Sequence, residues 1–403
     1  NHIFAPMFPA AAHPEVYRRR NDMPLKETQM TNPTARAMSR AEFLALMAGT
    51  AVPAALALSG CSLPAPSDPP SGDGRGIFSP EPAPVEPLAP VRDEVDIPGA
   101  LEDVPSSYFD PSNEPGPLER FYYDTNTYDD ETRDMEKFAI VYLPYGYDPD
   151  DAETRYNVLY LMHGASGSES SYFGTPEEPY GDKFLLDSMI AQGDMNPMIV
   201  VCVSYYPDNI EQDNDDYDAA LTKRFGHELR DLVPQFETRY NTYLESSDDE
   251  DIVASRGHRI FGGFSMGAVT TWYRMTDSMD WFEYFFPMSG SLFWSSEMYT
   301  ERRSAEWTAD FLVDSIDDQG YGLDDFFVFT TTGSLDFALG GLDLQVGKLR
   351  KHPDFFVFDD DAENATRVAP NAAYRVAAGY SHDSDGRDTY IYNCLPIFSE
   401  LMG

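Results

Sequence analysis

The chain has 403 residues, 69 of them acidic and 28 basic, which gives a formal net charge of -41. Such an acidic chain is a poor candidate for binding nucleic acid or anionic lipid surfaces, because both need clustered Lys and Arg. Its length allows two average domains or one large α/β domain with extensions, and its 14% aromatic content can supply a sizeable core.

The first predicted element is an apolar stretch over residues 43–58, which follows Arg36 and Arg40. It is short and interrupted by Gly and Pro, so it is typical of a signal-peptide core rather than of a membrane span. It ends in Leu58-Ser59-Gly60-Cys61, which resembles the bacterial lipobox, whose cysteine carries the lipid. The alternative is a buried core helix. We expect a lipoprotein-type signal at about 38–61 within an N-terminal segment 1–61.

Residues 62–97 contain nine prolines between Pro64 and Pro90, with Ser, Gly and Asp among them and no apolar periodicity. This composition predicts a disordered, extended linker. A lipid on Cys61 followed by such a spacer would hold an enzyme at the bacterial cell surface. We therefore expect an extracellular protein, either secreted or attached to a membrane only through that N-terminal lipid.

A globular pattern begins at about residue 98 and continues to 403, where apolar strand-like runs alternate with helical stretches. Several runs are apolar throughout, as expected for strands covered on both faces. This alternation predicts an α/β domain with a mostly parallel sheet and helices on both faces. The predicted strands are 138–143, 157–162, 198–204, 259–264, 284–288, 326–331 and 373–378, and the predicted helices are 183–192, 218–243, 267–276, 309–317, 340–351 and 388–402.

The sequence Gly263-Phe264-Ser265-Met266-Gly267 lies between a predicted strand and a predicted helix. The pattern G-x-S-x-G in this context is typical of a sharp turn that exposes a nucleophilic serine at the end of a strand. Glycines suit such a turn because it is strained and leaves no room for side chains on either flank. The alternative is an ordinary glycine-rich turn.

A nucleophilic serine needs a base, and the base needs an acid to orient it. In this kind of fold the acid and the histidine follow the serine along the chain. His382 lies just past the last predicted strand and is the candidate base, although alone it would be interpreted as a solvated loop histidine. Asp336 follows the strand 326–331 and is the candidate acid, with Asp343 as its rival.

The oxyanion of the tetrahedral intermediate that a serine nucleophile forms is stabilised by backbone N–H groups. One is expected from Met266, directly after the serine. The other is expected from Ala165 in the small-residue turn after the strand 157–162, where His163 is interpreted as a structural group. No metal-binding or phosphate-binding motif occurs in the chain, and this chemistry needs no cofactor.

Besides the serine turn, the chain contains Val141-Tyr142-Leu143-Pro144, Gly146-Tyr147-Asp148 and Tyr160-Leu161-Met162-His163-Gly164. With the serine turn, these segments resemble the esterase-D-type α/β-hydrolases, and more narrowly carbohydrate esterase family 1. The resemblance covers about residues 120–400 and implies an α/β-hydrolase fold. It also implies Ser265 as nucleophile, Asp336 as acid, His382 as base, and Met266 and Ala165 at the oxyanion hole.

The resemblance implies a serine esterase that hydrolyses feruloyl esters on plant cell-wall xylan. Acetyl-xylan deacetylation and acyl transfer by the same fold are alternatives, and a glycan-binding surface lipoprotein without catalytic activity is an alternative of another class. Tyr205, Tyr206 and Trp294 are positioned to stack on an aromatic acid, or else belong to the core. Cys202 and Cys394 are either buried small side chains or a disulfide.

Overall fold

The computed structural model describes residues 95–403 apart from 129–131, 152, 206–218, 295–302, 362–363 and 365–368. The predicted signal segment, Cys61, nearly all of the predicted linker and Tyr206 therefore lie outside the described residues, as does the side chain of Trp294. None of the helices in the described part of the chain is long and apolar enough to cross a membrane.

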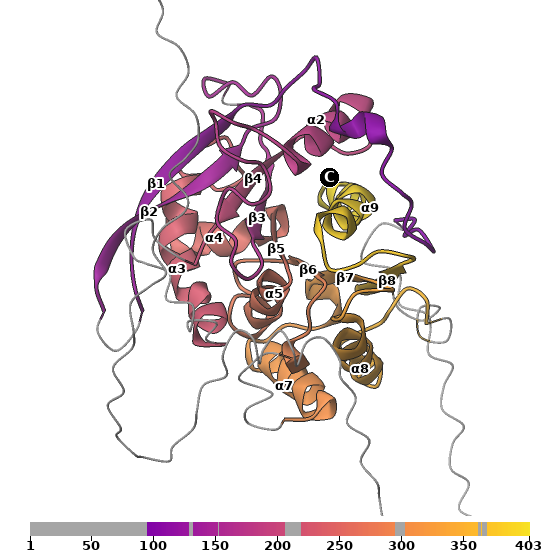
Figure 1. Ribbon diagram of the computed structural model, residues 1–403. Helices are drawn as coiled ribbons and strands as arrows, with labels where there is room; N and C mark the ends of the chain where they lie inside the picture. Colours follow the sequence, from indigo (N-terminus) through magenta and orange to yellow (C-terminus); the bar gives the residue numbers. More distant parts are fainter. Residues whose placement is uncertain are drawn as a thin grey trace, which may run out of the picture. The chain divides into compact units, whose positions relative to one another are not determined.

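One eight-stranded sheet, in the order β1-β2-β4-β3-β5-β6-β7-β8, forms the centre of the domain (Figure 1). The pairs β1–β2 and β2–β4 are antiparallel, and every other neighbouring pair is parallel. The predicted mostly parallel sheet is thus confirmed. The strands are β1 (Leu118–Asn126), β2 (Asp134–Tyr142), β3 (Asn157–Met162), β4 (Met198–Val203), β5 (Arg259–Phe264), β6 (Tyr284–Met288), β7 (Phe327–Gly333) and β8 (Ala372–Ala377).

Helices cover both faces of this sheet, as predicted. One face packs against α3, α5, α7 and α8, whose apolar side chains join a core cluster that includes Phe225, Trp272 and Leu312. The other face packs against α2 and α9 through a second cluster that includes Leu186 and Cys394. The helices are α2 (Asp182–Gln192), α3 (Ala219–Glu237), α4 (Asp249–Ala254), α5 (Met266–Asp277), α7 (Ala305–Asp318), α8 (Leu339–Leu349) and α9 (Ser384–Met402).

Three elements differ from the sequence prediction. The edge strand β1 and the six-residue α4 were not predicted: β1 alternates buried and exposed side chains, and α4 is rich in Asp. The helix predicted over 218–243 ends at Glu237. Beyond its end, Tyr156 donates its backbone N–H to the Asn241 carbonyl over 2.8 Å. The chain after Glu237 passes through a turn to an isolated parallel bridge between Thr242 and Tyr156, the residue just before β3.

Both cysteines in the described part of the chain are free and buried. Cys202 lies in β4 and Cys394 in α9, and each packs in the cluster beneath α2 and α9. The interpretation as small buried side chains is therefore confirmed, and the alternative of a disulfide between them is wrong.

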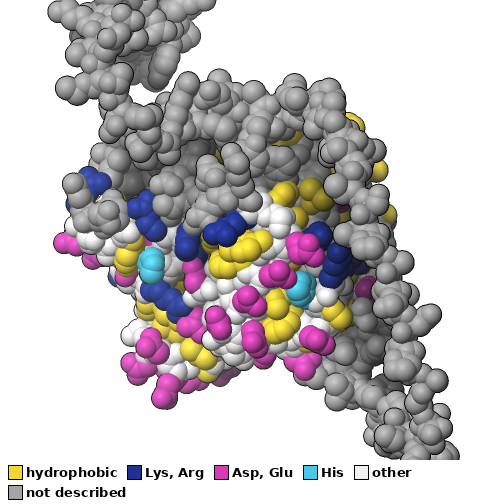
Figure 2. Space-filling model, turned by 90° about the horizontal axis from the view of Figure 1, so that it is seen from below, with side chains coloured by type: hydrophobic (Ala, Val, Ile, Leu, Met, Phe, Trp, Pro, Cys, Tyr) yellow, Lys and Arg dark blue, Asp and Glu magenta, His cyan; other side chains and the backbone are white. Residues whose placement is uncertain are grey.

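Acidic side chains are spread over the face seen from below, with Lys, Arg and apolar side chains among them (Figure 2). Some apolar side chains on the domain are well exposed, among them Leu344 of α8. Scattered exposed apolar residues are ordinary on a protein surface.

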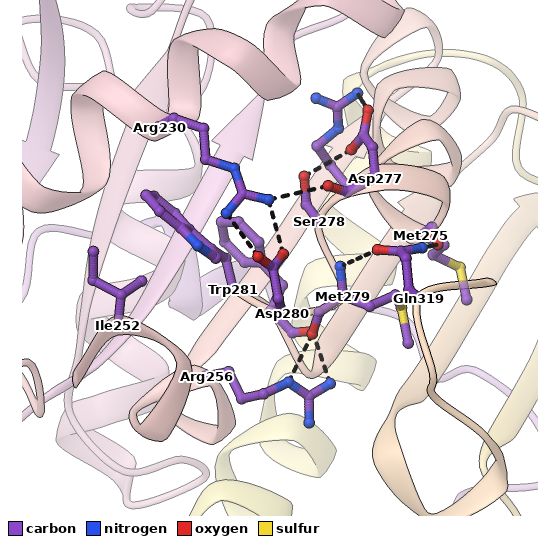
Figure 3. A network of polar contacts seen from close by, with 12 residues as sticks. Arg230, Ile252, Arg256, Met275, Asp277, Ser278, Met279, Asp280, Trp281 and Gln319 are labelled. Carbon is purple, nitrogen blue, oxygen red and sulfur yellow. Dashed lines mark hydrogen bonds and ion pairs between the residues drawn. The ribbon is translucent and has the colours of Figure 1, made fainter. Parts of the chain in front are cut away.

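The connection between α5 and β6 is fixed by side chains from three other parts of the chain (Figure 3). Arg230 of α3 forms a two-pronged ion pair with Asp280, at 2.8 and 2.9 Å. Arg256 donates to the Met279 carbonyl over 2.7 Å, and the Gln319 amide oxygen accepts from the Met279 N–H over 3.1 Å. Because β6 lies next to β5 in the sheet, these contacts also help fix the strand that leads into Ser265.

Candidate active site

Ser265 occupies the turn between β5 and α5. Its backbone has φ 60°, in the left-handed region that side chains other than glycine rarely adopt. A Cβ atom at Gly263 would lie 2.6 Å from the Gly267 backbone, and one at Gly267 would lie 2.3 Å from the Met162 carbonyl oxygen. Both glycines are therefore required by close backbone contact, and they keep the strained serine at the end of β5.

The segment after β3 passes beside this serine. A Cβ atom at Gly164 would lie 3.2 Å from the Ser265 Cβ. Ala165 follows in an exposed turn, and Ser166 has φ 63°. Met266 is the first residue of α5, so its N–H belongs to the helix end where such groups have no partner four residues earlier. The structure thus brings both predicted oxyanion-hole residues to the vicinity of Ser265.

Ser265, His382 and Asp336 are joined by hydrogen bonds. The Ser265 Oγ lies 2.8 Å from Nε2 of His382. The other ring nitrogen, Nδ1, lies 2.9 and 3.0 Å from the two carboxylate oxygens of Asp336. An ionised carboxylate can only accept, so Nδ1 carries the hydrogen and Nε2 is free to accept from the serine hydroxyl. This is the arrangement needed for a base that removes the serine proton.

The loops carrying the acid and the histidine are held together by backbone contacts. Leu335 donates its N–H to the Tyr380 carbonyl over 2.9 Å, and Ser334 donates to the Ala377 carbonyl over 2.9 Å. A Cβ atom at Gly333 would lie 2.1 Å from the Tyr380 carbonyl oxygen. The two loops meet because β7 and β8 are parallel neighbours, which brings their carboxyl ends to the same edge of the sheet.

Apolar side chains surround the histidine. The rings of Phe264 and Phe337 lie 4.6 and 4.0 Å from the His382 ring, measured between centroids. Asp336 is only 5% exposed, yet its neighbours Leu335 and Phe337 are 68% and 41% exposed. An exposed apolar pair around a buried acid suits contact with an apolar ligand. Sequence reasoning missed this pair, although the pattern of apolar residues on both sides of the candidate acid was visible.

The rival acid lies elsewhere. Asp343 is on α8, where it accepts a hydrogen bond of 2.6 Å from the Tyr374 hydroxyl. Asp336 is the carboxylate that contacts the ring of His382. Of the two candidate acids, Asp336 therefore lies beside His382 and Asp343 does not.

His163 and Tyr205 lie inside the protein, behind the serine. His163 is 1% exposed, and its ring nitrogens bond the Gly164 carbonyl over 2.7 Å and the Ser204 hydroxyl over 3.0 Å. Burial lowers the pKa of His163 to about 4, so the ring is neutral at neutral pH. Tyr205 is 6% exposed, and its hydroxyl bonds Thr270. Tyr205 packs in the core cluster that also holds Phe225, and its role as a substrate contact stays a prediction.

A family model described as "Putative esterase" matches residues 133–391. The chain belongs to this esterase family. The resemblance seen in its motifs and the predicted α/β-hydrolase fold are both confirmed. Among the described residues of this esterase, no group of three or more His, Cys, Asp or Glu side chains could hold a metal ion.

Two curated relatives and one solved structure illustrate the similarity. The esterase is 33% identical over 295 residues to endo-1,4-beta-xylanase Y of Acetivibrio thermocellus, covering 73% of this chain and 24% of that protein. It is 28% identical over 178 residues to an endo-1,4-beta-xylanase/feruloyl esterase of Xylanibacter ruminicola, covering 43% and 22%. The chain therefore spans about a quarter of the length of these relatives.

The solved structure is a serine-to-alanine mutant of the feruloyl esterase module from Clostridium thermocellum, complexed with sinapinate. It is 31% identical to this esterase, with a TM-score of 0.62, and the match covers 77% of this chain and 97% of that one. The match therefore extends over nearly the whole of that module.

Proposed function

We propose that this esterase hydrolyses feruloyl and related hydroxycinnamoyl esters on plant cell-wall xylan, with Ser265 as its nucleophile. The observation that carries the proposal is the continuous hydrogen-bonded chain from the Ser265 hydroxyl through His382 to the buried Asp336. A serine so connected gains a base and an orienting acid, which a lone serine lacks.

In the proposed mechanism, the Ser265 oxygen attacks the ester carbonyl while Nε2 of His382 takes the hydroxyl proton. Asp336 holds the ring in the required tautomer and stabilises its positive charge. The N–H groups of Met266 and Ala165 donate to the oxyanion. The intermediate collapses to an acyl-serine as His382 gives its proton to the leaving alcohol. Water then attacks the acyl-serine with His382 again as base, and the carboxylic acid leaves as His382 returns the proton to the Ser265 oxygen. No cofactor takes part.

Two findings support a hydroxycinnamoyl substrate. A module that is 31% identical carries the name feruloyl esterase and was complexed with sinapinate, itself a hydroxycinnamate. In this chain, the exposed side chains of Leu335 and Phe337 lie next to the proposed acid and base and offer apolar area to an aromatic ring. Tyr206 and Trp294 stay predictions as further contacts to that ring.

We also propose that the enzyme acts outside the cell, attached through a lipid on Cys61 with residues 62–97 as spacer. The support is the lipobox-like motif and the proline-rich composition after it. Treatment of the purified full-length protein with a lipoprotein lipase, followed by mass spectrometry of its N-terminal peptide, tests the lipid. An unmodified Cys61 in protein isolated from membranes would contradict it.

The substrate test compares methyl ferulate, acetylated xylan and a free acceptor sugar on the wild-type protein and on Ser265→Ala. The exposed Ser384→Ala is the matched control. We expect methyl ferulate to give the highest kcat/KM, and Ser265→Ala to lower kcat by about 10⁴-fold or more, with Ser384→Ala unchanged.

Faster release of acetate would identify an acetyl-xylan esterase, and faster transfer to the sugar than to water would identify an acyltransferase. Failure of the wild-type protein to react with a fluorophosphonate would support the alternative of a glycan-binding protein without catalytic activity.

A further inference from the structure

A buried cluster of one arginine and two carboxylates joins α2 to α9. Asp182 is the first residue of α2, and Arg387 and Asp388 lie near the beginning of α9. The Nη2 atom of Arg387 donates to Oδ1 of Asp182 over 2.6 Å and to Oδ1 of Asp388 over 3.2 Å. Asp182 is completely buried and Asp388 is 8% exposed. A single guanidinium nitrogen therefore serves two carboxyl groups that are shielded from water.

Ionising both carboxyl groups of this buried cluster at once is energetically unfavourable. Burial, followed by the charge of Asp182, raises the pKa of Asp388 to about 8, and burial also raises the pKa of Asp182. Within the described part of the chain, Oδ2 of Asp182 and Nε of Arg387 are buried without a hydrogen-bond partner. Two such carboxyl groups share a proton at neutral pH, and losing it leaves one guanidinium between two buried anions.

Few other titratable groups act on this cluster. The ring of Tyr172 lies under the Arg387 guanidinium, which is 4.9 Å from its centroid. Tyr180 and Cys202 also interact with the charges of Asp182 and Arg387. Burial raises the pKa of each of these three groups, so they stay neutral while the carboxyl groups titrate. Glu169 acts on Cys202 through its charge. Loss of a proton near pH 8 therefore falls to the carboxyl pair.

The cluster adjoins the histidine loop directly and the end of β3 through Tyr172. On one side, α9 begins two residues after His382, and the Arg387 N–H donates to the Asp383 carbonyl over 3.2 Å. On the other side, the Tyr172 hydroxyl donates to the Met162 carbonyl over 2.9 Å, at the end of β3 just before the turn with Ala165. Arg387 thus connects the start of α9, next to the histidine loop, to the end of β3 through the ring of Tyr172.

We propose that Asp182, Arg387 and Asp388 act as a proton-dependent clasp that positions the His382 loop against the Ala165 turn. The inference rests on the proposed function in treating these two loops as catalytic. None of the three side chains touches the reacting atoms, so they are positioning residues. When the shared proton is lost, repulsion between the two carboxylates separates the first turn of α9 from α2 and misaligns His382.

The activity test uses Asp388→Asn, which keeps the shape of the protonated side chain and cannot ionise. Asp385→Asn is the matched control, because it removes the same charge from an exposed site in the same helical turn. In wild type and Asp385→Asn, kcat on methyl ferulate should fall about tenfold between about pH 7 and about pH 9.5, with KM changing less than about twofold. The kcat of Asp388→Asn should stay nearly constant over the same pH range. An alkaline fall that is the same in all three proteins would overturn the clasp.

A second readout does not depend on hydrolysis. The imidazole signals of His382, identified in NMR spectra by their loss in His382→Gln, should shift or broaden above about pH 8 in wild type and stay sharp in Asp388→Asn. Signals that do not change in wild type over this range would refute the clasp, whether or not the variant folds. If wild type hydrolyses none of the esters while these signals still respond to Asp388, the proposed function fails and the clasp survives.

Discussion

Asp336 is nearly fully buried, and it contacts the imidazole of His382 through both carboxylate oxygens. A further hydrogen bond of 2.7 Å from the Ala338 N–H to Oδ1 fixes its orientation. These contacts hold the carboxylate in the plane in which it can accept from Nδ1. The position of the ring, and therefore the direction of its Nε2 lone pair, depends on this residue.

Replacing Asp336 by Asn should abolish most activity while leaving the fold intact. The amide can donate to Nδ1 and so favours the wrong tautomer, with the hydrogen on the nitrogen that faces Ser265. We expect kcat on methyl ferulate to fall by about 10³ to 10⁴-fold. Asp343→Asn is the control, because that carboxylate lies on α8 and pairs with Tyr374 of β8, and this variant should stay within about twofold of wild type. Equal losses in the two variants would contradict the assignment of the acid.

His163 makes the stability of the domain depend on pH. Its folded pKa of about 4 lies below the ordinary value of 6.5, so the unfolded chain takes up a proton as the pH falls below about 6.5 while the folded protein does not. The stabilising effect of a neutral His163 is therefore present above pH 6.5 and is lost as the pH falls toward 4. The loss amounts to about 2–3 kcal/mol.

Urea unfolding at several pH values between about 7 and 4 measures this effect. The free energy of unfolding of wild type should fall more steeply with decreasing pH than that of His163→Gln, whatever the cost of the substitution at pH 7. Parallel curves for the two proteins would show that His163 takes up its proton as readily in the folded state as in the unfolded chain.

At the scale of elements, a buried ion pair fixes β5 against α3. Arg259, the first residue of β5, donates to both carboxylate oxygens of Glu237 over 2.7 and 2.9 Å. The Tyr160 hydroxyl of β3 donates to the same carboxylate over 2.8 Å. The side chains of the ion pair are almost fully buried, at 0% and 2% exposure. The strand that leads into Ser265 therefore begins at a contact that links three elements.

Breaking this pair should destabilise the domain strongly. Glu237→Gln leaves a buried guanidinium without its counter-charge, and we expect the free energy of unfolding to fall by about 3–5 kcal/mol. Asp280→Asn is the control. It removes a carboxylate of the same kind of arginine pair, Arg230–Asp280, where both side chains are about a third exposed, and should cost less than about 1 kcal/mol. If both variants lost a similar free energy of unfolding, burial would not be what makes the Arg259–Glu237 pair more important.

The sequence was informative wherever an element is buried on both faces. The apolar runs at β3, β5 and β6 had their bounds predicted correctly, because every position there faces a helical layer. The edge strand β1 was missed because its alternating polar residues give a weaker signal. The end of α3 was misplaced because a tertiary contact, not a local breaker, decides it.

At the candidate site too, local sequence patterns predicted some residues, whereas others depend on the folded structure. Ser265 and His382 could be predicted as partners because chain order and turn chemistry restrict where a nucleophile and its base can lie, and the structure places Oγ of Ser265 2.8 Å from Nε2 of His382. The packing of Tyr205 in the core needed coordinates, since an aromatic residue after a strand is compatible with a core position and with a substrate contact. The exposed pair Leu335 and Phe337 was missed because burial of the acid between them is a property of the folded loop.

At the scale of the whole molecule, the chain before β1 packs on the domain. Its apolar side chains contact the core beneath α2 and α9; they include Val95, Ile97, Leu101 and Val104. Arg375 of β8 donates to the Pro98 carbonyl over 2.6 Å, and Asn393 of α9 exchanges two hydrogen bonds with the Glu102 backbone. The boundary predicted at residue 98 stays a prediction, and these contacts favour a start a few residues earlier.

Truncation tests how much this segment contributes. A chain that begins at Val95 should match the full-length protein in kcat/KM on methyl ferulate, because the proposed site lies within residues 95–403. A chain that begins at Leu118 loses the apolar contacts and the hydrogen bonds, so its free energy of unfolding should be lower by about 2–4 kcal/mol in urea denaturation. Equal stability of the two shortened chains would contradict a structural role for the segment.

The claim on which the account depends is that the acyl group passes through the Ser265 oxygen. We would mix the protein with 4-nitrophenyl ferulate, whose good leaving group makes acylation faster than hydrolysis, quench with acid and sequence the modified peptide by mass spectrometry. The account predicts a feruloyl group on Ser265 and none on the Ser265→Ala protein. Continued release of nitrophenol at the wild-type rate by Ser265→Ala, or a feruloyl group on another residue of the active protein, would contradict it.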